Sequence, residues 1–159
     1  MYMNIIEHLQ LLPHPEGGFY REYYRGDLNI STPQGDRSTA TAIYFYLPPH
    51  SRSHFHRLRN DELWFWQHGG TATAYLLHSD GTLDTHQVAS PASAHRGFIL
   101  FPRDTWFAAE TQSEGVLVSC VVAPGFSFAD FELGGRTELL EAYPAHAEVI
   151  ARCTREESL

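Results

Sequence analysis

The amino-acid sequence predicts an all-β protein, an antiparallel sandwich or barrel with short helices only at its two ends. Short segments rich in β-branched and aromatic side chains recur along the chain. Turn signals separate these segments, and helical periodicity is confined to the first and last parts of the sequence. Many short strands without alternating helices are typical of antiparallel sheets.

The chain starts with a predicted helix, because Ile5, Ile6, Leu9 and Leu12 recur at helical spacing before Pro13. A turn-rich segment, 14–18, follows. The predicted strands then cover residues 19–25, 40–47, 53–58, 62–67, 71–77, 82–88, 98–101, 106–111 and 116–123.

Breakers set the limits of these strands. Pro48-Pro49 ends the strand at 40–47, and Gly69-Gly70 ends the strand at 62–67. Ser79-Asp80-Gly81 predicts a hairpin, since Asp-Gly tolerates the positive φ angles of a tight turn. Residues 29–38 are predicted to form a polar loop, and apolar residues between 137 and 152 predict one or two short helices interrupted by Pro144.

Composition and charge limit the classes of function. The 159 residues, 43% hydrophobic and 19% charged, suit a single globular domain over 1–159. The net charge of -8 argues against nucleic acid and anionic membranes as partners. Two distant cysteines, no signal-peptide pattern at 1–12 and no membrane-length apolar stretch lead us to expect a reduced, cytoplasmic protein.

The most informative polar pattern is a pair of histidines followed by a carboxylate. His54 and His56 lie two positions apart on a predicted strand, so their imidazoles should share one side. Glu62 begins the next predicted strand and can join them. Two imidazoles and a carboxylate form either an acid–base cluster or a site for Fe(II), Mn or Zn with open coordination positions. We therefore expect these three residues to be catalytic residues, metal ligands or both.

Four more side chains are candidates for ligand binding. Trp64 shares the face of Glu62 and offers a flat apolar wall for a ring or a sugar face, or else belongs to the core. Glu16, Tyr20 and Arg21 surround a Gly-Gly pair that allows close backbone approach. Arg21 either binds a carboxylate or phosphate of a ligand, or forms a surface ion pair.

Six segments together resemble a known family. Residues 14–22, 41–45, 53–58, 61–64, 102–106 and 122–132 are similar, in this order, to the cupin subfamily catalogued as domain of unknown function 985, or cupin type 5. The resemblance implies a double-stranded jelly-roll barrel, a homodimer and a shape related to sugar-nucleotide epimerases. It implies no established reaction.

The chain departs from the superfamily pattern at two positions. Asp104 stands where a turn glycine is usual, and Phe107 stands where a fourth metal ligand, a histidine, is usual. The same register points Phe107 inward, which makes it a further candidate for ligand contact and makes the site more apolar.

Three functions are compatible with these residues. The first is an epimerase or isomerase that acts on a carbohydrate-like or carboxylate-bearing small molecule, with His54 or His56 removing a proton next to a carbonyl. The second is a non-catalytic binder or sensor, which Phe107 favours. The third is a metal-dependent dioxygenase that uses two histidines and one carboxylate.

Overall fold

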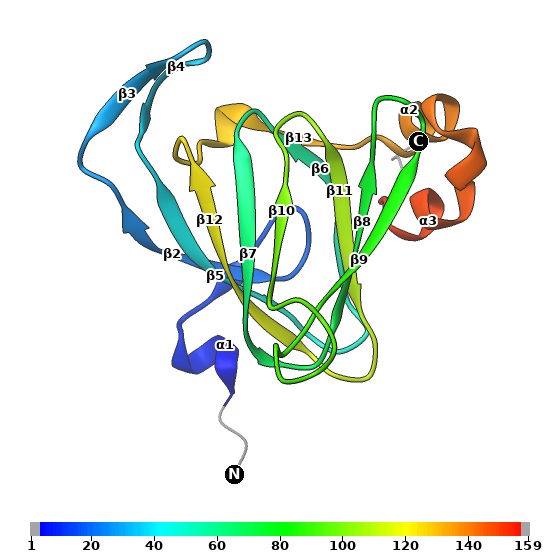
Figure 1. Cartoon of the computed structure of the whole chain (residues 1–159), viewed down its shortest axis with the longest axis horizontal. Coiled ribbons are helices and arrows are strands. Elements are labelled where there is room, and N and C mark those ends of the chain that lie inside the picture. Colours follow the sequence, from blue (N-terminus) through cyan, green and yellow to red (C-terminus); the bar gives the residue numbers. More distant parts are fainter. Residues whose placement is uncertain (1–3, 157–159) are drawn as a thin grey trace.

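The computed structural model describes residues 4–156 and consists mainly of two antiparallel sheets (Figure 1). The larger sheet has the strand order β1-β2-β5-β12-β7-β10, and the second has the order β13-β6-β11-β8-β9. The bounds of the larger sheet are β1 Leu12–Pro13, β2 Phe19–Arg25, β5 Thr41–Leu47, β12 Val116–Ala123, β7 Asp61–Gly69 and β10 Phe98–Phe101. Those of the second are β13 Phe131–Leu133, β6 Arg52–Leu58, β11 Trp106–Thr111, β8 Ala72–Leu77 and β9 Leu83–Val88.

The main core lies between these two sheets. Alternate residues of a strand point to opposite faces, and the inward residues here are large and apolar. Phe45 and Trp64 enter the core from the larger sheet, and Phe107 and Ala74 from the second. Each of these side chains is at most 1% exposed. The sheets remain two separate sheets, so the closed barrel that we expected is not formed by their hydrogen bonds.

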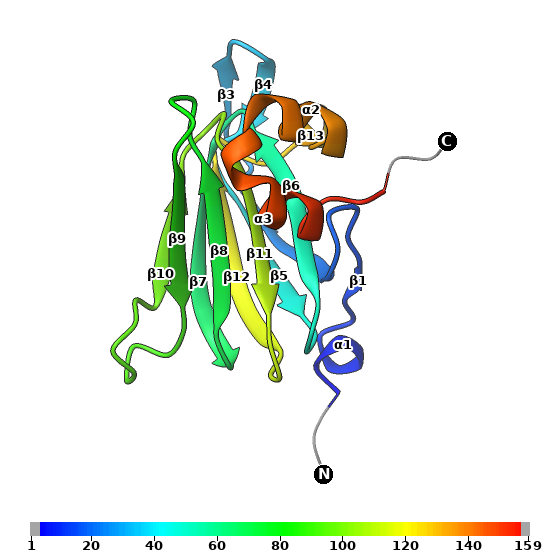
Figure 2. The ribbon, with the colours of Figure 1, turned by 90° about the vertical axis from the view of Figure 1, so that its right-hand side faces the viewer.

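A second apolar cluster joins the C-terminal helices to the outer face of the second sheet (Figure 2). These helices are α2 (Arg136–Ala142), the 3-10 turn η2 (Pro144–His146) and α3 (Ala147–Arg152), which confirms the predicted interruption at Pro144. Phe55 and Trp106 on the strands pack with Leu139 and Ile150 on the helices. Trp106 and Phe107 therefore face opposite ways, as alternation predicts.

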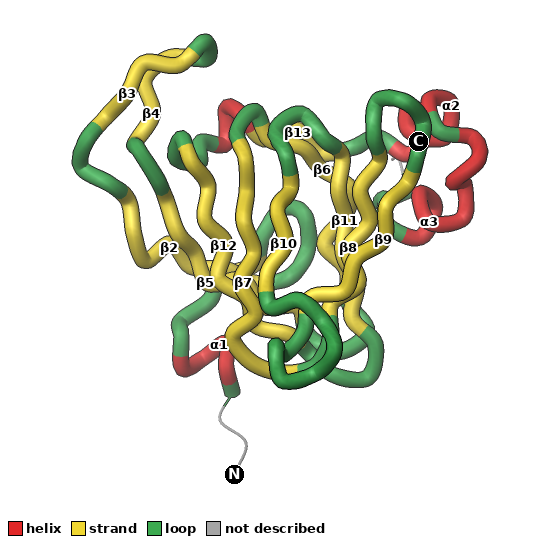
Figure 3. The backbone as a smooth tube through the Cα atoms, viewed as in Figure 1, coloured by secondary structure: helices red, strands yellow, loops and turns green. Residues whose placement is uncertain are grey.

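The predicted loop at residues 29–38 is instead a hairpin of β3 (Asn29–Thr32) and β4 (Gly35–Ser38). It projects beyond both sheets as an arm (Figures 1 and 3). Its turn is closed by a hydrogen bond from Thr32 Oγ1 to Gly35 O. The polar composition that suggested a loop reflects the position of this arm, because a hairpin outside the core has no face to bury.

The N-terminal helix is shorter than predicted. It comprises α1 (Ile5–His8), after which Leu12 and Pro13 pair with β2 as strand β1. β13 was not predicted, because three residues carry too little periodicity to be recognised. None of the helices within residues 4–156 is long and apolar enough to cross a membrane.

Candidate active site

Two histidines and two glutamates line a buried cavity between the two sheets. Glu62 comes from β7 and His56 from β6, while His14 and Glu16 come from the loop that joins β1 to β2. All four side chains belong to residues that are at most 9% exposed. The free volume of the cavity is about 30 Å³, enough for one or two water molecules. We call this cavity the chamber.

The loop at 14–18 is held against the edge of β6, which brings Glu16 into the chamber. The backbone N–H of His54 donates to Glu16 O at 2.6 Å, and His14 N donates to Gly18 O at 3.0 Å. Gly17 makes this approach possible, because it has a φ of 104° and a side chain there would collide with the carbonyl of Arg52. The Gly17-Gly18 pair therefore allows the loop to place Glu16 in the chamber.

His56 and Glu16 form a buried ion pair. Nε2 of His56 lies 2.8 Å from Oε2 of Glu16, and Nδ1 of His56 lies 2.7 Å from the carbonyl oxygen of His54. A carbonyl and a carboxylate only accept hydrogen bonds, so this geometry fits an imidazolium that donates from both nitrogens. Burial alone would lower the pKa of His56, but the charge and hydrogen bond of Glu16 outweigh it and raise the pKa. Burial alone would raise the pKa of Glu16, and His56 lowers it.

His14 has the opposite character. Its Nδ1 accepts a hydrogen bond from the backbone N–H of Glu16 at 3.2 Å, so that nitrogen carries no proton. Burial lowers the pKa of His14, and the nearby charge of Glu16 only partly offsets this effect. Its ring packs edge-on against Tyr20, with 4.6 Å between ring centroids. His14 is therefore uncharged at neutral pH and forms part of the wall of the chamber.

Glu62 is the group of the chamber that titrates near neutrality. Burial and the neighbouring charge of Glu16 raise its pKa to about 7. The indole Nε1 of Trp64 donates to its carboxylate at 3.0 Å, and the thiol of Cys120 also hydrogen-bonds to it. Burial and Glu62 raise the pKa of Cys120 well above its usual value, so this thiol stays protonated and is a poor nucleophile.

His54 does not share the chamber with His56 in the way that strand alternation predicted. β6 has one residue more than β11 between the pairs Ser53–Ala109 and His56–Phe107, and this irregularity breaks the alternation at His54. The Nδ1 of His54 instead contacts Glu16 O at 2.7 Å, and its half-buried ring lies near Arg52 and Arg155. The bulge thus corrects the expectation that His54, His56 and Glu62 converge.

The remaining predicted residues divide into those that line the chamber and those that do not. Glu16 and Tyr20 line it. Trp64 and Phe107, both 1% exposed, support it from the core, where the Phe107 ring packs 4.1 Å from that of His56. Arg21 is exposed and donates to Gln10, so its expected ligand contact is replaced by a surface hydrogen bond.

The side chains that surround the chamber do not fit the predicted metal site. Over residues 4–156, no three His, Cys, Asp or Glu side chains are grouped so that they would hold a metal ion. Both ring nitrogens of His56 are engaged by oxygen acceptors, and His54 is turned toward a backbone carbonyl. Phe107 occupies the position of the fourth ligand beside His56. We therefore derive no chemical step through Fe, Mn or Zn.

Several residues that line the chamber were not among the predicted site residues. His14 belongs to the turn-rich segment, but a lone histidine next to a proline carries no distinguishing signal. Thr41, Phe126 and Phe131 also line the chamber, and Thr41 Oγ1 accepts from the N–H of Phe126 at 2.9 Å. The density of aromatic residues at 123–131 is the signal in the sequence that could have pointed to Phe126 and Phe131.

Two facing antiparallel sheets with a cavity between them are compatible with a cupin-type protein. The family model described as cupin superfamily (DUF985) matches residues 3–134, and the chain belongs to this family. The family resemblance inferred from sequence is thus confirmed.

Relatives and solved structures agree with this assignment. The structure of protein SO0799 from Shewanella oneidensis is 39% identical, with a TM-score of 0.87 over 96% of each chain. A hypothetical protein from Leishmania major is 32% identical, with a TM-score of 0.87 over 95% of this chain and 97% of that one. The uncharacterized protein YML079W of Saccharomyces cerevisiae is 27% identical over 85% of this chain and 76% of its own.

Oxalate decarboxylase from Bacillus subtilis is a more distant neighbour. It is 16% identical, with a TM-score of 0.57 over 91% of this chain and 37% of that one. Its structure has been studied for its Mn(II) centres. At this identity the likeness shows the fold alone.

Proposed function

We propose that the chain is an isomerase or epimerase that moves a proton on a small polar substrate held in the chamber. The observation that carries this proposal is the position of two buried carboxyl groups, those of Glu16 and Glu62, in the lining of one cavity. The pKa of Glu16 is lowered by His56, and that of Glu62 is raised to about 7 by burial. Two titratable groups of this kind are typical of an acid and a base that act at neutral pH.

The two carboxyl groups have complementary roles. The carboxylate of Glu16 removes a proton from the carbon next to a substrate carbonyl, and the C–H electron pair moves into a new C=C bond. The protonated form of Glu62 delivers a proton to the carbonyl oxygen, which gives an enediol or enol. Return of a proton to carbon, on the other face or at the neighbouring carbon, completes an epimerisation or isomerisation without any net redox change.

Other residues would position these groups. His56 keeps Glu16 ionised and donates a hydrogen bond to its carboxylate. Hydrogen bonds from Trp64 and Cys120 hold the carboxyl group of Glu62 in place. The small, buried volume excludes bulk water from the reacting atoms. Such a mechanism needs no metal ion, and within residues 4–156 no three His, Cys, Asp or Glu side chains are grouped to hold one.

Deuterium exchange tests the proposal. Neutral aldoses and ketoses, sugar acids and sugar phosphates are incubated with the protein in D2O, and ¹H NMR follows loss of the signal next to the carbonyl. We expect exchange with at least one compound, and a fall of about 10²-fold or more in Glu16→Gln and Glu62→Gln. Arg59→Gln, a half-exposed surface change beside Asp104, should leave exchange unchanged. Binding without exchange by any compound would instead support the non-catalytic binder.

A further inference from the structure

A wide open groove lies next to the chamber. The chamber and the groove share the lining residues Tyr20, Ile43 and Phe126. The free volume of the groove is about 520 Å³, against about 30 Å³ for the chamber. One wall comes from the base of the β3–β4 arm, and the other comes from residues 126–128. The groove therefore borders the chamber at these three side chains.

The two volumes define the shape of the ligand. About 30 Å³ admits a carbonyl or hydroxyl-bearing end but not a whole ring. The groove, in contrast, has room for a molecule of the size of a sugar unit or larger. The bound molecule then has a narrow reacting end in the chamber and a wider body outside it.

Charge in the groove is balanced and already paired. Among the groove residues, Arg25 binds Glu22 at 2.6 Å and Arg37 binds Asp130 at 2.8 Å. Arg37 is held by two parallel hydrogen bonds to the buried Asp130, a geometry that leaves its guanidinium little freedom to turn to a ligand. A phosphate or carboxylate in the groove would therefore compete with Glu22 or Asp130 for a guanidinium group that is already paired.

The chamber disfavours an anion as well. Its cation, the imidazolium of His56, is bound to Glu16, and Glu62 also lines the cavity. A substrate carboxylate would therefore meet the carboxylate of Glu16 and the carboxyl group of Glu62 without a free positive charge, in a region where charges interact strongly because water is excluded. Hydroxyl and carbonyl groups meet no such penalty, since they can exchange hydrogen bonds with these side chains.

The groove also has flat apolar surfaces. Phe126 and Phe128 pack edge to face with 4.9 Å between ring centroids, and Phe128 is 51% exposed. Asn29 and Ser127 lie beside them with polar side chains. Aromatic faces combined with mixed donors and acceptors suit a molecule with an apolar C–H face and a rim of hydroxyl groups.

We infer that the ligand is a carbohydrate without phosphate or carboxylate, whose body lies on Phe126 and Phe128 and whose carbonyl-bearing end enters the chamber. This inference rests on the proposed function for the identity of the reacting site. It narrows the substrate class from carbohydrate-like or carboxylate-bearing molecules to uncharged sugars.

A panel of matched sugars tests the charge requirement. Neutral mono- and disaccharides are compared with the corresponding uronic acids and phosphate esters by saturation-transfer NMR and titration calorimetry at pH 7. We expect at least one neutral sugar to bind, with a Kd at least about tenfold lower than that of its acid or phosphate counterpart. The inference is overturned if the anionic members bind equally well or better, or if no neutral member binds.

Two matched phenylalanine variants test the position of the ligand. Phe128→Leu should weaken binding of the neutral sugar by about threefold or more, because the aromatic face is lost. Phe98→Leu is the control, since Phe98 is 50% exposed and lies on β10, outside the groove. Equal effects of the two changes, or no effect of either, would contradict the inference.

The binding measurements are independent of turnover. A neutral sugar that binds in the groove without deuterium exchange would leave this inference intact and remove the proposed proton transfer. Deuterium exchange with sugar acids or sugar phosphates would support the proposed proton transfer and overturn the inference that the ligand is uncharged.

Discussion

The buried ion pair of His56 and Glu16 determines both the charge and the stability of the chamber. Each member keeps its charge only because the other is within 2.8 Å. Removal of one partner from such a pair leaves an uncompensated charge in the interior, which is more costly than replacement of both by neutral groups. The pair therefore makes a stability prediction that does not depend on the substrate.

We predict that His56→Leu lowers the free energy of unfolding by about 3–5 kcal/mol at pH 7. The folded-state pKa of Glu16 is lowered, so its stabilising effect is present above its unfolded value and disappears as the pH falls through the folded value. The raised pKa of His56 means that its contribution disappears as the pH rises through the folded value. Urea denaturation at a series of pH values that spans both transitions measures the free energy of unfolding of the variant and of the unchanged protein.

The double variant His56→Leu with Glu16→Gln is the control for this prediction. It removes both charges, so it should be less destabilised at pH 7 than His56→Leu alone. A loss of stability in the double variant equal to the sum of the two single losses would show that the ion pair contributes nothing.

Glu62 is expected to destabilise the folded protein at high pH. Its folded-state pKa of about 7 lies above the unfolded value, so the native state binds more protons and loses stability as the pH rises from about 4.5 to 7. Glu62→Gln should therefore be more stable than the unchanged protein at pH 9, by up to about 3 kcal/mol, with a smaller difference at pH 5. Urea midpoints at the two pH values test this, and an equal difference at both would contradict the assigned pKa.

The sequence identified part of this residue-scale arrangement. His56 and Glu62 were found because their spacing on two consecutive predicted strands is visible in the sequence. Glu16 was found because the neighbouring Gly-Gly pair marks a close backbone approach. His54 was misplaced because the bulge in β6 depends on pairing with β11. The pairing of His56 with Glu16 was not predicted, since it depends on how the 14–18 loop folds onto the edge of β6.

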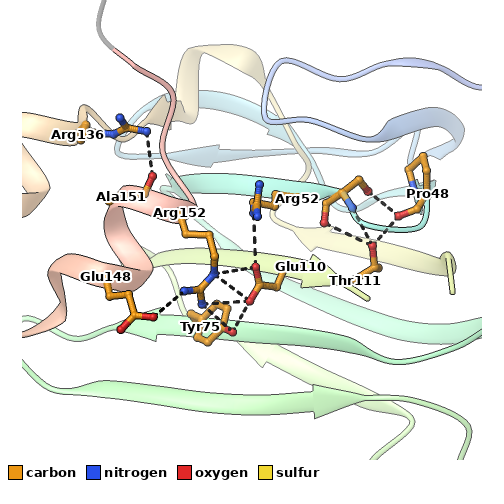
Figure 4. Close-up of polar contacts among 10 residues, drawn as sticks. Pro48, Arg52, Tyr75, Glu110, Thr111, Arg136, Glu148, Ala151 and Arg152 are labelled. Carbon is orange, nitrogen blue, oxygen red and sulfur yellow. Dashed lines mark hydrogen bonds and ion pairs between the residues drawn. The ribbon is translucent and has the colours of Figure 1, made fainter. Parts of the chain in front are cut away.

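Among the elements, the last helix is attached to the sheet by a polar network as well as by apolar packing. Arg152 of α3 donates to both carboxylate oxygens of Glu110 on β11, at 3.0 and 3.2 Å for its Nε, and Tyr75 of β8 donates to Glu110 at 2.6 Å (Figure 4). Arg52 of β6 approaches the same carboxylate at 3.5 Å. Burial alone would raise the pKa of Glu110, but the hydrogen bonds of Arg152 and Tyr75 outweigh it and lower the pKa.

We predict that Arg152→Leu destabilises the protein by about 1–3 kcal/mol at pH 7, because it leaves the buried Glu110 with fewer donors. The lowered pKa of Glu110 implies that this network stabilises the fold above its unfolded value, and that the effect is lost as the pH falls. Hydrogen exchange should show faster exchange of amides in α3. Arg59→Leu, which removes an exposed pair with Asp104, should change stability little.

Most strands were predictable because inward and outward residues alternate and breakers delimit them. β2, β10, β11 and β12 have the predicted bounds. The β3–β4 arm was missed because both of its faces are largely polar, so alternation gives no signal. Its turn chemistry, with Pro33 and a Gly35 at a φ of 109°, was the information that would have favoured a hairpin.

At the scale of the whole molecule, the two sheets differ in what covers their outer faces. The C-terminal helices cover the second sheet (Figure 2), whereas large side chains remain exposed on the outer face of the larger sheet. Phe65 of β7 is 37% exposed, and Phe98 and Leu100 of β10 are 50% and 45% exposed. The rings of Phe65 and Phe98 stack at 6.1 Å. An apolar sheet face of this kind is typical of an interaction surface.

We predict that the protein is a homodimer that buries this face, in keeping with the family resemblance. A stable dimer buries about 800 Å² on each partner, and Phe65, Phe98 and Leu100 form an apolar part of such an area. Phe98→Glu should therefore give a monomer, because a charge would be buried against the partner without a counter-charge.

Leu133→Glu is the control. Leu133 is 38% exposed and lies on β13 of the second sheet, so this variant should remain dimeric. Light scattering coupled to size-exclusion chromatography measures the mass of each. A monomeric unchanged protein, or a dimer that survives Phe98→Glu and dissociates with Leu133→Glu, would refute this choice of face.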